Sequence, residues 1–134
     1  MNLFTRPVIR VCIAVTAATA ALVPAAALAS ASPSDPTVGD TVRYVFYSDY
    51  QSNESLTYFD ADNEIQTMEN PTLPSDASEK GWHYGSLTLT SRSTYQLAGS
   101  SIQTSGYRAA CRVYVNDTLV ASDSASGRYA VAIC

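Results

Sequence analysis

The fold of this chain is decided by its C-terminal stretch, Cys111-Arg-Val-Tyr-Val-Asn-Asp-Thr-Leu-Val-Ala-Ser-Asp-Ser-Ala-Ser-Gly-Arg-Tyr-Ala-Val-Ala-Ile-Cys134. Three runs of β-forming residues, over 107–115, 118–122 and 128–133, are separated by two turn signals and end at a cysteine. Asn116-Asp117 has the length and residue type of a tight hairpin turn, although the usual Gly is absent. This pattern predicts a β-meander closed by a disulfide between Cys111 and Cys134.

The preceding residues predict further strands and no helix. Runs rich in β-branched and aromatic residues or in alternating polarity predict strands over 41–47, 54–59, 64–69, 86–90 (or from Trp82) and 95–97. The stretches 70–81 and 99–106 contain turn-forming residues and are expected to be loops. The predicted fold class is all-β, an antiparallel β-sandwich of the immunoglobulin-like type with about 6–7 strands. An open barrel is the alternative.

The N-terminus has the features of an export signal. Arg6 and Arg10 precede the uncharged run 11–29, and Ala27-Leu28-Ala29 offers the small residues that signal peptidase requires. We therefore predict a signal peptide over 1–29, in a signal helix, followed by a flexible Pro- and Ser-rich linker over 30–40 and one domain over 41–134. A retained membrane anchor is the alternative, which the many alanines and Pro24 disfavour.

Charge and cysteine content limit the kinds of function. Removing the signal peptide leaves six basic and twelve acidic residues, a formal net charge of −6. Nucleic-acid binding is not expected, because such binding depends on basic residues that neutralise phosphates. Cys111 and Cys134 are the only cysteines left, so one disulfide is the expected state in an oxidising compartment. A free-thiol pair or a metal site is disfavoured, because no histidine lies near either cysteine in the sequence.

The sequence contains few groups suited to catalysis. His83 is the only histidine, and no Gly-x-Ser-x-Gly motif accompanies it. Asp60-Ala61-Asp62-Asn63-Glu64 offers alternating oxygens but lacks the glycine of a calcium-binding loop, so we interpret it as a hairpin turn. We predict no catalytic residue, no metal ligand and no cofactor.

Aromatic residues are the remaining feature of interest. All nine tyrosines follow the signal peptide, where they either fill the edges of a core or line an apolar groove. The residues considered for an interaction surface are Tyr44, Tyr58, Trp82, Tyr84 and Tyr114.

The C-terminal stretch also resembles a known family. Cys-Arg-Val-Tyr-Val-Asn-Asp-Thr-Leu-Val at 111–120, Ser-Gly-Arg-Tyr-Ala at 126–130 and the closing Cys134 resemble the MmpS family, small accessory proteins of MmpL-type exporters in mycobacteria and related actinobacteria. The early strand at 42–46, the segment 56–60 and Leu73-Pro74 are similar to further elements of that family.

The resemblance implies a β-sandwich without enzymatic activity, outside the cytoplasm, in the cell envelope or secreted. It implies an MmpL-type membrane transporter as partner and an apolar cargo, a lipid or a siderophore. Membrane association is expected only if the N-terminal segment is retained. The alternatives are a free secreted binding module, such as a protease inhibitor or small-ligand carrier, and a small secreted hydrolase.

Overall fold

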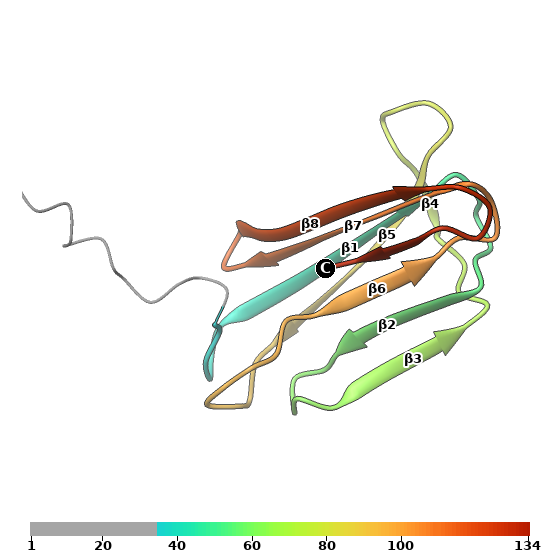
Figure 1. Cartoon of the computed structure of the whole chain (residues 1–134). Coiled ribbons are helices and arrows are strands. Elements are labelled where there is room, and N and C mark those ends of the chain that lie inside the picture. The colour runs from blue at the N-terminus through green and yellow to red at the C-terminus, as the bar shows by residue number, and fades with distance from the viewer. Residues whose placement is uncertain (1–34) are drawn as a thin grey trace, which may run out of the picture.

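The computed structural model describes residues 35–134, which form nine strands and no helix (Figure 1). The strands are β1 (Thr41–Ser48), β2 (Ser55–Phe59), β3 (Ile65–Glu69), β4 (Ser75–Asp76), β5 (His83–Thr90), β6 (Ser100–Gln103), β7 (Arg108–Val115), β8 (Thr118–Ser126) and β9 (Val131–Ile133). Among these residues, no helix is long and apolar enough to cross a membrane. The predicted signal peptide, 1–29, lies outside the described residues.

The strands form two antiparallel sheets. One has five strands in the order β4-β5-β1-β7-β8, and the other has four in the order β3-β2-β6-β9. The predicted all-β, antiparallel class is therefore confirmed, with nine strands in place of six or seven. The predicted Asn116-Asp117 hairpin is present, and both residues adopt positive φ angles, 48° and 66°.

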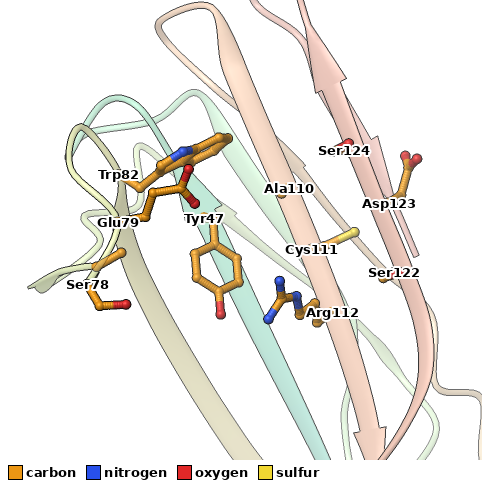
Figure 2. A pocket seen from close by; sticks show the side chains of 11 residues that line it. Tyr47, Ser78, Glu79, Trp82, Ala110, Cys111, Arg112, Ser122, Asp123 and Ser124 are labelled. Carbon is orange, nitrogen blue, oxygen red and sulfur yellow. The ribbon is translucent and has the colours of Figure 1, made fainter.

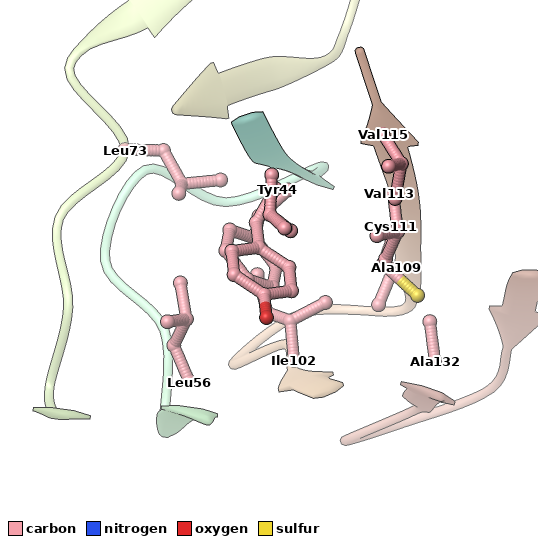
Figure 3. Packing of buried hydrophobic residues seen from close by; sticks show 11 residues of the cluster. Tyr44, Leu56, Leu73, Ile102, Ala109, Cys111, Val113, Val115 and Ala132 are labelled. Atoms are coloured by element: carbon pink, nitrogen blue, oxygen red, sulfur yellow. The ribbon is translucent and has the colours of Figure 1, made fainter. Parts of the chain in front are cut away.

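The hydrophobic core lies between the two sheets (Figure 3). Strand residues alternate between two faces, so β1 directs Val42, Tyr44 and Phe46 inward while the residues between them face outward. The four-stranded sheet contributes Leu56 and Ile102, which are also buried. Because this inner face is used by the core, only the opposite face of each sheet is available to a ligand.

The predicted disulfide is confirmed, and it links the two sheets. Cys111 lies on β7, and Cys134 follows β9 directly, with their Cα atoms 6.1 Å apart. The predicted meander is wrong in its last strand, because β9 pairs with β6 through Ile102 and Ala132 and not with β8. The chain changes sheet after β8, so the disulfide connects the two layers.

One predicted strand is also wrong, and each of the two predicted loops contains a strand: the two-residue β4 lies within 70–81, where it pairs with β5, and β6 lies within 99–106. Residues 95–97 form no strand, because the side chain of Gln96 is buried and bonds to Ser91 and to backbone carbonyls. Residues 100–103, expected to be a loop, form β6 between β2 and β9. Apart from Ile102, the residues of β6 have little preference for strands. They form one because β2 and β9 on either side provide its backbone hydrogen-bond partners.

Residues that precede β1 also make contacts with the domain. Pro36 is buried, and its carbonyl accepts a hydrogen bond from the N–H of Gln96. The Asp40 carboxylate accepts a hydrogen bond from the Asn116 side chain, and the Asp40 carbonyl accepts one from the N–H of Ser91. The part of the predicted linker from Pro36 to Asp40 therefore packs with the domain, because its backbone finds partners there.

Candidate binding site

The outer face of the five-stranded sheet carries arginine and aromatic side chains. On β1 the outward residues include Arg43 and Tyr47, because their neighbours face the core. On β7 the same alternation turns Arg108, Arg112 and Tyr114 outward. Three of the six basic residues in the described part of this acidic chain thus share one face.

Each of these arginines lies over an aromatic ring. The guanidinium carbon of Arg43 is 4.1 Å from the ring centre of Tyr114. The corresponding distances are 4.5 Å for Arg108 over Trp82 and 5.3 Å for Arg112 over Tyr47. Attraction between a cation and the ring face orients these side chains without neutralising their charge.

The three arginines keep their charge available for a ligand. Within residues 35–134, the ion pairs are Arg92 with Asp62 and His83 with Asp76, and neither includes one of the three arginines of this face. A hydrogen bond to the Tyr114 side chain, with a smaller contribution from Tyr47, raises the pKa of the Arg112 guanidinium. Arg112 therefore remains a cation at any physiological pH.

A groove of about 500 Å³ lies on this face (Figure 2). Its floor is formed by the adjacent strands β1, β7 and β8, and the loop between β4 and β5 overhangs it. The residues that line it are Tyr47, Ala77, Ser78, Glu79, Trp82, Ala110, Cys111, Arg112, Ser122, Asp123 and Ser124. A smaller hollow lined by Asp76 and Tyr84, among others, adjoins it at Tyr47.

Local contacts hold the overhanging loop in place. The N–H of Ala77 donates to the carbonyl of Trp82 at 2.8 Å, which closes the loop at its base. Gly81 adopts a φ of +86°, a conformation that glycine tolerates and most residues do not. Arg108 donates a hydrogen bond to the Gly81 carbonyl at 3.3 Å, which links the loop to β7.

The predicted interaction residues divide between the two faces. Trp82 lines the groove, Tyr84 lies beside it against Tyr47, and Tyr114 lies further along the same outer face. Tyr44 is buried in the core instead, and the partly buried Tyr58 packs against it with a ring-centre distance of 5.7 Å. Tyr44 is therefore not part of an exposed surface.

Tyr44 satisfies its hydroxyl inside the protein. The hydroxyl donates to the carbonyl of Phe59 at 2.9 Å. Burial raises the pKa of Tyr44 well above its ordinary value, so the group stays neutral. Its role is structural, because neither the ring nor the hydroxyl reaches solvent.

Tyr47, Arg112 and the three serines of the groove were not among the interaction residues predicted from the sequence. Alternation within Arg108–Val115 would have indicated the outward arginines once Cys111 was placed in the core. Ser122 and Ser124 carried no such signal, because serines are common on the exposed face of a strand.

The other candidates from the sequence lie away from the groove. His83 contacts Asp76 on β4 at 2.9 Å and does not line the groove. In the turn, the Asp60 carboxylate accepts hydrogen bonds from the N–H groups of Asp62 and Glu64, both at 3.0 Å. No group of three or more His, Cys, Asp or Glu side chains positioned to hold a metal ion occurs within 35–134.

Comparisons with known proteins identify no family for the chain. No protein-family model matches it, and no curated protein matches it.

Proposed function

We propose that this chain is an exported, non-enzymatic binding domain of the MmpS type, which assists an MmpL-type transporter in exporting a lipid or siderophore. The observation that carries the proposal concerns the segment Cys111–Cys134. This segment bears the family resemblance, contains both cysteines of the disulfide, and supplies part of the floor of the groove. One stretch of sequence thus combines the resemblance with the candidate site.

An extracytoplasmic location is part of this proposal. Disulfides persist mainly in oxidising compartments, and the sequence pattern of 1–29 favours export. We also propose that the two sheets follow an immunoglobulin-like arrangement. Two antiparallel sheets of five and four strands, joined by a disulfide across the core, support it.

The residues that line the groove suit ligand binding without catalysis. Its lining combines aromatic rings, an arginine and hydroxyl groups, which are typical of recognition. The histidine lies outside it, and both cysteines are joined in the disulfide. We therefore assign the domain a role in contacting cargo or transporter.

Deleting the gene in the source organism tests the accessory role. Export of an apolar product should fall, and the full-length chain should restore it. The variant Trp82→Ala should restore it less well, because the overhanging ring of the groove is lost, whereas Arg128→Gln, in a turn away from the groove, should restore it fully. Unchanged export after deletion would exclude the accessory role.

A free secreted binding module is the second candidate, and the Ala27-Leu28-Ala29 pattern favours it. N-terminal sequencing of the protein recovered from medium and from membranes separates the two. Full release of a chain beginning near Ser30 would support the free module. Retention of the chain at the envelope would support the accessory.

A further inference from the structure

We infer that the groove binds an acidic saccharide, a sugar ring that carries a carboxylate or phosphate group. This inference depends on the proposed role of the domain as a binding module, and it does not depend on which transporter the domain assists. It uses the rings, the cation and the hydroxyl groups that the outer face brings together at one place (Figure 2).

The two rings of the groove provide surfaces for a sugar. Tyr47 lies on the floor, and Trp82 overhangs it from the loop (Figure 2). One face of a pyranose ring presents only C–H groups, which pack against the negative face of an aromatic ring. Outside the groove, Tyr84 packs against Tyr47 with a ring-centre distance of 6.1 Å. The guanidinium carbon of Arg108 lies 4.5 Å from the ring centre of Trp82. Both rings are therefore held in position.

Arg112 provides the site for the acidic group. Its guanidinium carbon lies over the Tyr47 ring, 5.3 Å from the ring centre, and within the groove. A guanidinium matches the geometry of a carboxylate or phosphate with two parallel hydrogen bonds. Asp123 points toward β9, so Arg112 and Glu79 are the charged residues that face the groove, and Arg112 is the one that can pair with an anion.

The remaining polar groups suit sugar hydroxyls. Ser78, Ser122 and Ser124 can each donate and accept a hydrogen bond, and Glu79 at the rim accepts. The carboxylate of Asp123 accepts a hydrogen bond from the N–H of Ile133 on β9 at 2.9 Å, so it is directed toward the other sheet and away from the sugar hydroxyls. Donors and acceptors together favour a hydroxylated ring over a bare anion.

The size of the groove agrees with a small ligand. Small-molecule sites commonly occupy about 300–1,000 Å³, and this groove falls within that range. Because the groove is shallow and lies on a sheet face, it accommodates one or two sugar rings more readily than a folded partner.

Tryptophan fluorescence gives a direct test, since Trp82 is the only tryptophan in the chain. The intact mature protein is titrated with glucuronic acid, with methyl glucoside, which has the ring without the charge, and with inorganic phosphate, which has the charge without the ring. We expect a saturable change with glucuronic acid and binding about tenfold weaker or more for the other two, because each lacks one set of contacts.

Variants assign the contacts. Arg112→Gln should reduce the affinity for glucuronic acid about tenfold and bring it to that for methyl glucoside. Arg112→Lys should fall between, since it keeps the charge and loses the planar fork. Tyr47→Leu should weaken both sugars. The control Arg128→Gln changes an arginine that also lies over a tyrosine ring, Tyr129, but outside the groove, and should bind like the wild type.

Several results would overturn the inference. Phosphate or methyl glucoside binding as tightly as glucuronic acid would do so, as would the absence of binding by all three probes. An Arg112→Gln variant with unchanged selectivity would also exclude the site. If export still falls on gene deletion while no probe binds, the saccharide site is excluded and the accessory role is retained.

Discussion

At the scale of single residues, Asp49 organises the turn that leads into β7. Its carboxylate accepts hydrogen bonds from the N–H groups of Tyr107 and Arg108, at 3.0 Å each, and from the Thr104 hydroxyl at 3.1 Å. Gly106 lies inside this turn, and a Cβ there would come within 2.6 Å of the Asp49 carboxylate oxygen. The turn thus places Arg108 at the end of the groove.

The pKa of Asp49 predicts a pH dependence of stability. Burial raises this pKa, but the hydrogen bonds from Arg108, Tyr107 and Thr104 together lower it below the ordinary value of 3.8. A carboxyl with a lowered folded-state pKa stabilises the fold above its unfolded-state pKa, about 4, and loses that contribution as pH falls through the folded value.

We therefore expect Asp49→Asn to lower the free energy of unfolding at pH 7 by about 1 kcal/mol, and by progressively less below about pH 4. Thermal unfolding by circular dichroism between pH 7 and pH 3 measures this difference. Asp35→Asn, at an exposed position, should leave the curve unchanged. A loss of stability that is equal at all pH values would contradict the role of the charge.

At the scale of elements, the β7–β8 hairpin and β9 form a unit that spans both sheets. β7 and β8 pair along their length in the five-stranded sheet, while β9 belongs to the other. The connection is held by the disulfide and by the hydrogen bond between Asp123 and the N–H of Ile133. The short β9 therefore depends on links outside its own three residues.

Replacing either cysteine with serine should destabilise the fold. Closing a loop with a sequence separation of 23 residues stabilises the native state by about 3 kcal/mol in the chain-entropy treatment. We expect Cys111→Ser and Cys134→Ser each to lower the melting temperature by about 10 °C or more under oxidising conditions. The difference from wild type should nearly vanish in reductant.

The comparison between these two variants controls for burial. Cys111 is fully buried and Cys134 only partly, so an effect of the serine hydroxyl alone would appear mainly at Cys111. Equal melting of the wild type and both variants in oxidant would exclude a stabilising role for the disulfide.

At the scale of the whole molecule, the domain extends ahead of its first strand. Pro36 is buried, its carbonyl binds the N–H of Gln96, and the N–H of Gly39 donates to the carbonyl of Ser91 at 2.9 Å. These contacts cover the end of the molecule opposite the overhanging loop (Figure 1). The residues before β1 therefore contribute to the packed domain.

A chain that begins at Thr41 should be less stable than one that begins at Asp35. Removing 35–40 exposes the groups that Pro36 and Gly39 cover and leaves their hydrogen-bond partners without protein contacts. We expect a loss of about 1–3 kcal/mol, measured by urea unfolding of the two purified chains. Equal midpoints and slopes would show that the segment contributes nothing to stability.

How much could be predicted from sequence depended on how local the signal was. Local residue types in 41–47 and 107–115 predicted strands that the structure contains within one or two residues. In contrast, Ser100–Gln103 has one apolar residue, Ile102, and becomes a strand only between β2 and β9. Tyr44 was considered for the surface because its residue type suits either side of a strand.

The sequence by itself determined the all-β class, the tight turn at Asn116-Asp117, the pairing of the two cysteines, and the acidic charge. The strand class and the turn depend on residues that are close in the sequence, and the cysteine pairing and the charge follow from the numbers of cysteines and of charged residues. Only the tertiary structure decided which face of each sheet is covered, which sheet receives β9, and that Tyr47, Trp82 and Arg112 share a groove. The reason is physical: a strand's alternation defines two faces, but the partner that buries one of them comes from a distant part of the chain.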